Sequence, residues 1–142
     1  MIELYLATHP TVGAHIMTPR PGYAHHGVYV GEGRVVHYAG LRRGLRRGPV
    51  QEVSFEDFTA PLGVWRQVPT QTAFESAEVV RRARSRLGEN RYRMFTNNCE
   101  HFCHWCLHGE PHSFQVQRRV RAVLRFIVAQ LASGVGAGWR RC

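Results

Sequence analysis

The chain has 142 residues, of which 44% are apolar and 11% aromatic, and its formal net charge is +9. This length suffices to bury the core of one domain without disulfide or metal staples, and this composition excludes an intrinsically disordered protein. All nineteen Lys or Arg positions are arginine. Because the guanidinium group grips phosphate through two hydrogen bonds, the surplus is compatible with anionic headgroups or nucleic acid, and equally with a solvated surface.

The amino-terminal stretch, MIELYLATHP at 1–10, has neither the basic start nor the long apolar run of a secretory signal, which predicts a cytoplasmic protein. Thiols stay reduced in that compartment. Three of the four cysteines, Cys99, Cys103 and Cys106, lie in one short segment. This distribution is unlike a disulfide framework, so we expect free thiols.

Short β-branched and aromatic runs predict a small sheet of about five strands. The candidate strands are 14–17, 26–31, 34–39, 50–58 and 63–68. The GEG sequence at 31–33 predicts a tight hairpin turn between the second and third strands. The doubled LRRG sequence in 40–49 has no apolar period, which predicts a flexible basic loop that contacts lipid or other anions.

A helix is predicted after the sheet. Thr72 and Glu75 have the spacing of a capping box, and Gly88 is placed to end the helix. The apolar face is predicted to contain Phe74, Ala77, Val80, Ala83 and Leu87.

The cysteine-rich segment predicts a second helix over 99–107, with Asn98 or the asparagine before it as the N-cap. The first turn of a helix has unpaired N–H groups and the positive end of the dipole, which favour a thiolate. Cys99 is therefore a candidate nucleophile. Cys103 and Cys106 fall on the same face deeper in the helix, where cysteine behaves as a small buried hydrophobe.

Other interpretations of Cys99 stay open on this local pattern. A zinc site needs converging ligands, usually two Cys pairs, and the chain has no second CxxC, so no metal is predicted. A buried structural cysteine is the other alternative. A nucleophile also needs a base. His25 and His37 flank the predicted hairpin and can lie side by side on one face of the sheet, whereas His26 points to the opposite face.

Two motifs together carry a family resemblance. HHGVYVGEGRVVHYAG at 25–40 and NNCEHFCHWCLHG at 97–109 resemble the patterns of the lecithin retinol acyltransferase-like family, which includes the H-rev107-type phospholipases/acyltransferases and many bacterial proteins. The resemblance covers roughly residues 13 to 110. It implies an α+β, circularly permuted papain-like (NlpC/P60) fold, in which a small antiparallel sheet packs against helices and the nucleophile lies at a helix N-terminus.

The resemblance also implies roles for individual residues. Cys99 matches the nucleophile, His25 matches the base, and His37 matches the polar residue that orients the base. Tyr23 matches an oxyanion contributor that acts with the Cys99 backbone N–H, and Asn98 supports this helix start. No cofactor and no metal are implied.

The implied activity is that of a thiol-dependent acyltransferase or phospholipase A. It acts on glycerophospholipid esters through an acyl-thioester on Cys99, and water or an unidentified acyl acceptor then takes the acyl group. Two alternatives stay open: a cysteine peptidase or amidase with the same triad, and a non-catalytic basic module that binds nucleic acid. The leading interpretation has a phospholipid acyl donor and expects no nucleic-acid partner.

The domain organisation is predicted as a catalytic domain at 1–115 and an amphipathic C-terminal tail at 116–142. The apolar run from Val120 to Trp139 is interrupted by Arg121 and Arg125, so it falls short of the about twenty apolar residues of a spanning helix. It predicts an interfacial helix, with a final core-packing helix as the alternative. We therefore expect a cytoplasmic protein with peripheral membrane contact through the tail and the Arg-rich loop.

Overall fold

The computed structural model describes residues 9–42, 46–110 and 113–136. Its elements, in chain order, are β1 (His15–Arg20), β2 (Tyr23–Gly31), β3 (Arg34–Arg42), β4 (Arg46–Ser54), α1 (Phe55–Thr59), β5 (Arg66–Gln67), α2 (Ser76–Ser85), α3 (Cys99–His108) and α4 (Phe114–Gly136). The chain forms two compact units, 1–112 and 113–142. Most of the amino-terminal stretch that motivates the cytoplasmic prediction lies outside the described residues.

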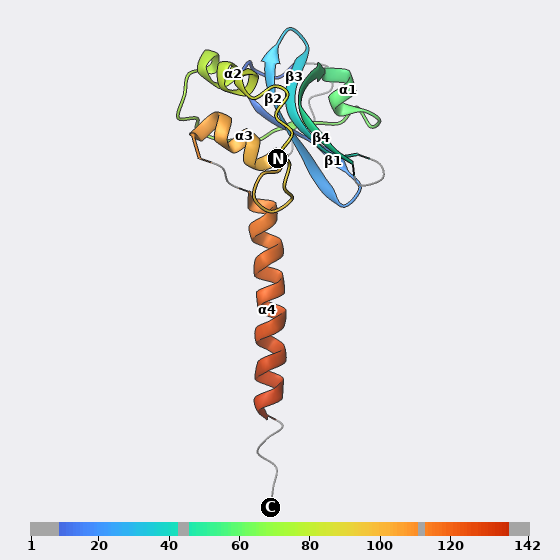
Figure 1. Cartoon of the computed structure of the whole chain (residues 1–142), viewed down its shortest axis with the longest axis vertical. Coiled ribbons are helices and arrows are strands. Elements are labelled where there is room, and N and C mark those ends of the chain that lie inside the picture. The colour runs from blue at the N-terminus through green and yellow to red at the C-terminus, as the bar shows by residue number, and fades with distance from the viewer. Residues whose placement is uncertain (1–8, 43–45, 111–112, 137–142) are drawn as a thin grey trace, which may run out of the picture. The chain divides into compact units, whose positions relative to one another are not determined.

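The first unit is an α+β arrangement around one antiparallel sheet of five strands, in the order β4-β3-β2-β1-β5. Figure 1 shows α2 and α3 on one side of this sheet and α1 on the other. The predicted hairpin turn between β2 and β3 is confirmed. Glu32 and Gly33 both have positive φ, 52° and 67°, as in the primed turns whose twist matches that of paired strands.

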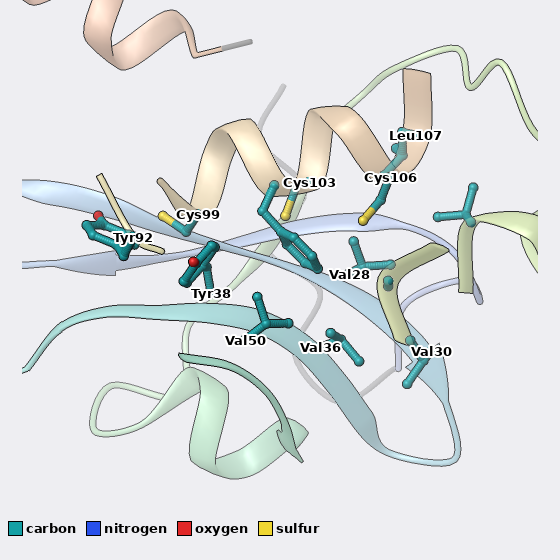
Figure 2. Close-up of a cluster of buried hydrophobic side chains, with 13 residues drawn as sticks. Val28, Val30, Val36, Tyr38, Val50, Tyr92, Cys99, Cys103, Cys106 and Leu107 are labelled. Atoms are coloured by element: carbon teal, nitrogen blue, oxygen red, sulfur yellow. The ribbon is translucent and has the colours of Figure 1, made fainter. Parts of the chain in front are cut away.

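Alternation along β2 divides the side chains between two cores. Val28 packs with α2 and α3 in the larger core, and Tyr29 packs with Phe58 of α1 in the smaller one. Figure 2 shows Cys103 and Cys106 pointing from α3 toward the valines of the sheet. Both thiols are fully buried, which confirms the prediction that these two cysteines are packing residues.

The strand predictions are wrong at several ends. The strand expected over 50–58 stops at Ser54, because the Ser54 hydroxyl accepts a hydrogen bond from the Asp57 N–H and caps α1. The strand expected over 63–68 is only the two-residue β5. The flanks of the expected basic loop belong to β3 and β4. Residues 43–45 of that loop lie outside the described residues.

Helix α2 starts later than predicted. The Thr72 hydroxyl donates to the Phe74 carbonyl instead of capping, and the N-cap is Glu75, without a side-chain bond. The predicted apolar face is right in part, because Ala83 is buried and Phe74 and Val80 pack against the core. It omits Val79, which is buried, and includes Leu87, which is exposed. The Arg82 guanidinium lies over aromatic rings of neighbouring elements. The sequence pattern assigns the packed face of α2 to apolar residues only. Arg82 also packs there, because a guanidinium group can stack on aromatic rings.

The prediction for α3 is confirmed. The Asn98 side chain accepts from the N–H groups of Glu100 and His101, and Gly109 ends the helix in the left-handed conformation, with φ 84°. The helix therefore begins at Cys99, with the cysteine in the first turn.

The second unit consists of α4, whose bounds include most of the predicted tail. Large apolar side chains on it are exposed at Val120, Val123, Leu124, Phe126, Ile127, Val128 and Leu131. All of these except Phe126 recur at the spacing of one helix face. Among the described residues, no helix is both long enough and apolar enough to cross a bilayer.

Candidate active site

The Cys99 thiol lies at the buried start of α3, against the main chain of β2. Burial raises its pKa to about 11, a hydrogen bond from the His26 backbone N–H opposes this rise, and the charge of Glu100 adds to it. The thiol is therefore protonated at neutral pH. The thiolate expected from the helix start does not form, because desolvation outweighs the helix-terminal N–H groups.

The structure brings His25 and His37 together across β2 and β3. Nε2 of His25 lies 2.7 Å from Nδ1 of His37, and both side chains are buried. Phe58 packs against both rings, with centroids 5.4 Å and 5.6 Å away. We call these residues the first histidine pair.

Burial holds the pKa of His25 well below its usual value, and the charges of His37 and Arg20 lower it further. The ring is therefore neutral at physiological pH, so one of its nitrogens has a lone pair. In the tautomer whose Nε2 donates to His37, Nδ1 is the nitrogen through which His25 can accept a proton.

Gln51 is a site residue that the sequence interpretation missed. It pairs with His37 in the register of β3 and β4, and its side-chain Nε2 lies 3.2 Å from Nε2 of His37. Hydrogen-bond partners distinguish the two ends of an amide. If the amide is flipped, so that its oxygen takes the place of its Nε2, His25 donates to His37 and His37 donates to Gln51. This is the arrangement that leaves the lone pair on Nδ1 of His25.

The structure does not join Cys99 and His25 by a hydrogen bond; within the described chain, their recorded bonds go to other groups. His25 shares its face of the sheet with Tyr29 and Phe58, whereas Cys99 packs in the core on the opposite face. The paired register of β2 with β3 starts at Val28. At the first histidine pair, the two side chains connect the two strands.

Tyr23 lies at the start of β2, 37% exposed, with its ring centroid 6.4 Å from that of His25. Partial burial and the charge of Cys99 raise the pKa of its phenol. The hydroxyl is therefore protonated and able to donate a hydrogen bond.

A second histidine pair, His15 and His26, lies on the α3 side of the sheet. Nε2 of His15 is 2.7 Å from Nδ1 of His26, and both side chains are buried. Burial lowers the pKa of His26 to about 4, against an opposing effect of the charge of Glu100. The sequence interpretation did not include His15. One sequence feature could have identified His15: it lies on the expected strand 14–17, next to the expected strand that contains His26.

The histidines and cysteines do not converge on a metal site. Across the residues that the structure describes, no group of three or more His, Cys, Asp or Glu side chains is arranged to hold a metal ion.

Comparison with known proteins gives one family. The family model described as "Lecithin retinol acyltransferase" matches residues 8–112. Proteins named lecithin retinol acyltransferase are similar to this chain: the one from Homo sapiens is 28% identical over 87% of the chain, and the one from Rattus norvegicus is 27% identical over 82%. The matches cover 66% and 63% of these relatives, so the chain spans somewhat less than two thirds of their length.

Proposed function

Because the chain belongs to the lecithin retinol acyltransferase family, we propose that it is a thiol-dependent acyltransferase or phospholipase A that acts on glycerophospholipid esters. The observation that carries the proposal is a buried cysteine in the first turn of α3. Family membership supports an acyltransfer activity, and the names of the relatives support a lipid substrate. No nucleic-acid partner is proposed.

In this proposal Cys99 is the nucleophile, His25 the general base and His37 the residue that orients the base. A thiol with a pKa near 11 needs a base to remove its proton during attack. A neutral His25 held by His37 supports that role. The structure has no hydrogen bond between these two groups, both of which lie in the described part of the chain, so the proposed mechanism requires that substrate binding rearranges this part of the site and brings Nδ1 of His25 to the thiol.

The proposed reaction has two halves. Nδ1 of His25 takes the proton from Cys99 as the sulfur attacks the ester carbonyl carbon, and the same proton then goes to the departing oxygen of the lysophospholipid. The acyl group stays on sulfur as a thioester. Water or an acceptor alcohol or amine next gives its proton to His25 and attacks the thioester carbonyl. The sulfur leaves and recovers the proton from His25.

The negative oxygen of each tetrahedral intermediate needs hydrogen-bond donors. We propose the Tyr23 hydroxyl and the backbone N–H of Cys99 for this role. A protonated phenol that responds to the charge of Cys99 supports the first. Asn98 supports the second, because its side chain fixes the first turn of α3.

The finer fold assignment is also a proposal. A histidine strand that precedes the cysteine helix supports a circularly permuted papain-like (NlpC/P60) arrangement. We further propose that the protein is cytoplasmic and meets membranes peripherally. The exposed apolar face of α4 supports this, with Arg121 and Arg125 able to reach anionic headgroups while the apolar side chains insert.

The test is the intact mass of the protein after brief incubation with phosphatidylcholine vesicles. We expect a fatty-acyl increment that maps to Cys99 in the wild type and is absent from Cys99→Ala and His25→Ala. The matched control is Cys103→Ala, which removes a neighbouring buried thiol and should keep the increment. An increment that persists in Cys99→Ala contradicts the proposal. Absence of both acylation and lysolipid release from the folded wild type would favour the peptidase or amidase alternative.

A further inference from the structure

An exposed apolar pair immediately precedes the nucleophile helix. Met94 and Phe95, which we call the Met-Phe tip, are 41% and 59% exposed. Tyr92, two residues before Met94, and Asn98, three residues after Phe95, are both buried. Figure 2 shows Tyr92 beside Cys99 at one end of the core cluster. The tip therefore projects from the part of the surface that covers the nucleophile.

The Met-Phe tip is held in a fixed hairpin. The Arg93 N–H donates to the Asn97 carbonyl and the Asn97 N–H donates to the Arg93 carbonyl, both at 2.9 Å. The Asn98 side chain donates from Nδ2 to the Met94 carbonyl at 2.8 Å. The Oδ1 atom of the same Asn98 side chain caps α3. One side chain thus joins the tip to the first turn that contains the nucleophile.

The charged side chains in the hairpin that contains the Met-Phe tip are all positive. The hairpin sequence RYRMFTN at 91–97 contains two arginines and no acidic residue. Arg91 and Arg93 are both exposed, and the Asn97 side chain fixes the backbone at Arg91 through a 2.9 Å hydrogen bond to its carbonyl. In a phospholipid monolayer, phosphate groups lie next to apolar acyl chains. Two exposed arginines that precede two exposed apolar residues in the hairpin match this order.

We propose that the Met-Phe tip inserts into the surface of a phospholipid bilayer while Arg91 and Arg93 contact its phosphate groups. This docking brings the ester bond of a lipid to the surface near the start of α3, and Tyr23 of the proposed site is also partly exposed. The inference deepens the proposed function and rests on it for its purpose, but its physical content, insertion at residues 94 and 95, is measured without any turnover. It concerns the first unit of the chain and does not depend on the exposed face of α4.

The first experiment reports insertion directly. Phe95→Trp is mixed with phosphatidylcholine vesicles with and without phosphatidylglycerol, and the wild-type spectrum is subtracted to remove the native tryptophans. We expect a blue shift and quenching by brominated acyl chains, stronger with phosphatidylglycerol. Val12→Trp is the matched control, because Val12 is 44% exposed and packs near Gly31, at the opposite end of β2 from Tyr23. It carries the same α4 and should show neither change.

The second experiment uses the rate of Cys99 acylation by vesicles divided by the rate with a monomeric short-chain phospholipid. Burial of a phenyl ring contributes enough to partitioning that Phe95→Ser should lower this ratio about tenfold or more. Val12→Ser should leave the ratio unchanged. Arg93→Gln should lower it only when the vesicles contain phosphatidylglycerol.

The outcomes separate the two proposals. Acylation of Cys99 without a blue shift of Phe95→Trp overturns the docking inference and leaves the proposed function intact. A blue shift with no acylation supports docking and contradicts the proposed function. An equal blue shift for Phe95→Trp and Val12→Trp overturns the docking inference, because insertion would then not be specific to the Met-Phe tip.

Discussion

The two histidine pairs lie on opposite faces of one sheet and share the same contact between Nε2 of one ring and Nδ1 of the other. His25 and His37 lie on the side of Phe58, and His15 and His26 lie on the side of α3. In each pair the bonded ring nitrogens are 2.7 Å apart. Burial is the largest cause that lowers the pKa of His25, His15 and His26. A short distance between buried imidazoles therefore does not identify a catalytic pair.

The pairs differ in the groups around them. The charges that act on His25 come from His37, Arg20 and His26, all of which disfavour its protonated form. His26 instead has the carboxylate of Glu100 nearby, which favours the protonated form. A base that must start neutral suits the first environment. Beyond His37 the first histidine pair also continues to the amide of Gln51, which can fix the tautomer.

The largest expected effect comes from two variants, each of which removes one imidazole ring from one of the two histidine pairs. His25→Gln should lower the rate of acyl-thioester formation by about a hundredfold to ten-thousandfold, the range for loss of a general base. His15→Gln should change this rate little. The measurement is single-turnover acylation with a chromogenic ester, and circular dichroism checks that both variants fold. Equal losses for the two variants would show that the pairs are not functionally distinct.

The next effect concerns Gln51. Gln51→Leu removes the acceptor for His37 and should lower acylation about tenfold to a hundredfold, the cost of leaving one partly buried polar group without its partner. Gln51→Glu keeps an acceptor and adds a negative charge that favours protonation of the first histidine pair. Its activity should persist, with the acidic limb of the pH–rate profile moved to higher pH. The proposed amide orientation is wrong if Gln51→Glu is as inactive as Gln51→Leu.

The second histidine pair should make the free energy of unfolding depend on pH in the acid range. Because the pKa of His26 falls from 6.5 unfolded to about 4 folded, the unfolded chain binds more protons between these values, so stability rises with pH there and is lost on acidification. Each such histidine contributes a slope of about 1.4 kcal/mol per pH unit within its window. Urea unfolding across this range should show a shallower slope for the double variant His15→Leu, His26→Leu than for the wild type. An unchanged slope would contradict this assignment.

Local signals explain which parts of the site the sequence predicts. The Asn98 cap and the turn at 31–33 are contiguous patterns, so the sequence alone locates the start of α3 and the β2–β3 hairpin correctly. Gln51 and His15 contact their histidine partners from other strands. Finding them requires the register of the sheet, which short patterns do not encode.

The predicted face of α2 is incomplete for a different reason. The sequence pattern counts arginine as solvent-facing, yet the guanidinium of Arg82 lies 4.0 Å from the ring centroid of Trp105 and donates to the carbonyl of the same residue. Arg86 likewise lies over Phe102 and Trp105. Arginine that packs through its planar face belongs to the helix interface, and apolar periodicity alone does not detect it.

The smallest expected effect tests whether Glu100 links the second histidine pair to the nucleophile. Its charge raises the pKa of both His26 and Cys99, so Glu100→Gln should lower both by a small amount. Iodoacetamide alkylation of Cys99 followed against pH measures the pKa of the thiol, and proton NMR titration of the His26 ring measures that of the imidazole. Glu52→Gln is the matched control, because that carboxylate is held by ion pairs elsewhere on the sheet. Movement of the two pKa values in opposite directions would mean that Glu100→Gln acts by rearranging the start of α3 and not through its charge, since one lost negative charge makes a thiolate easier and an imidazolium harder to form.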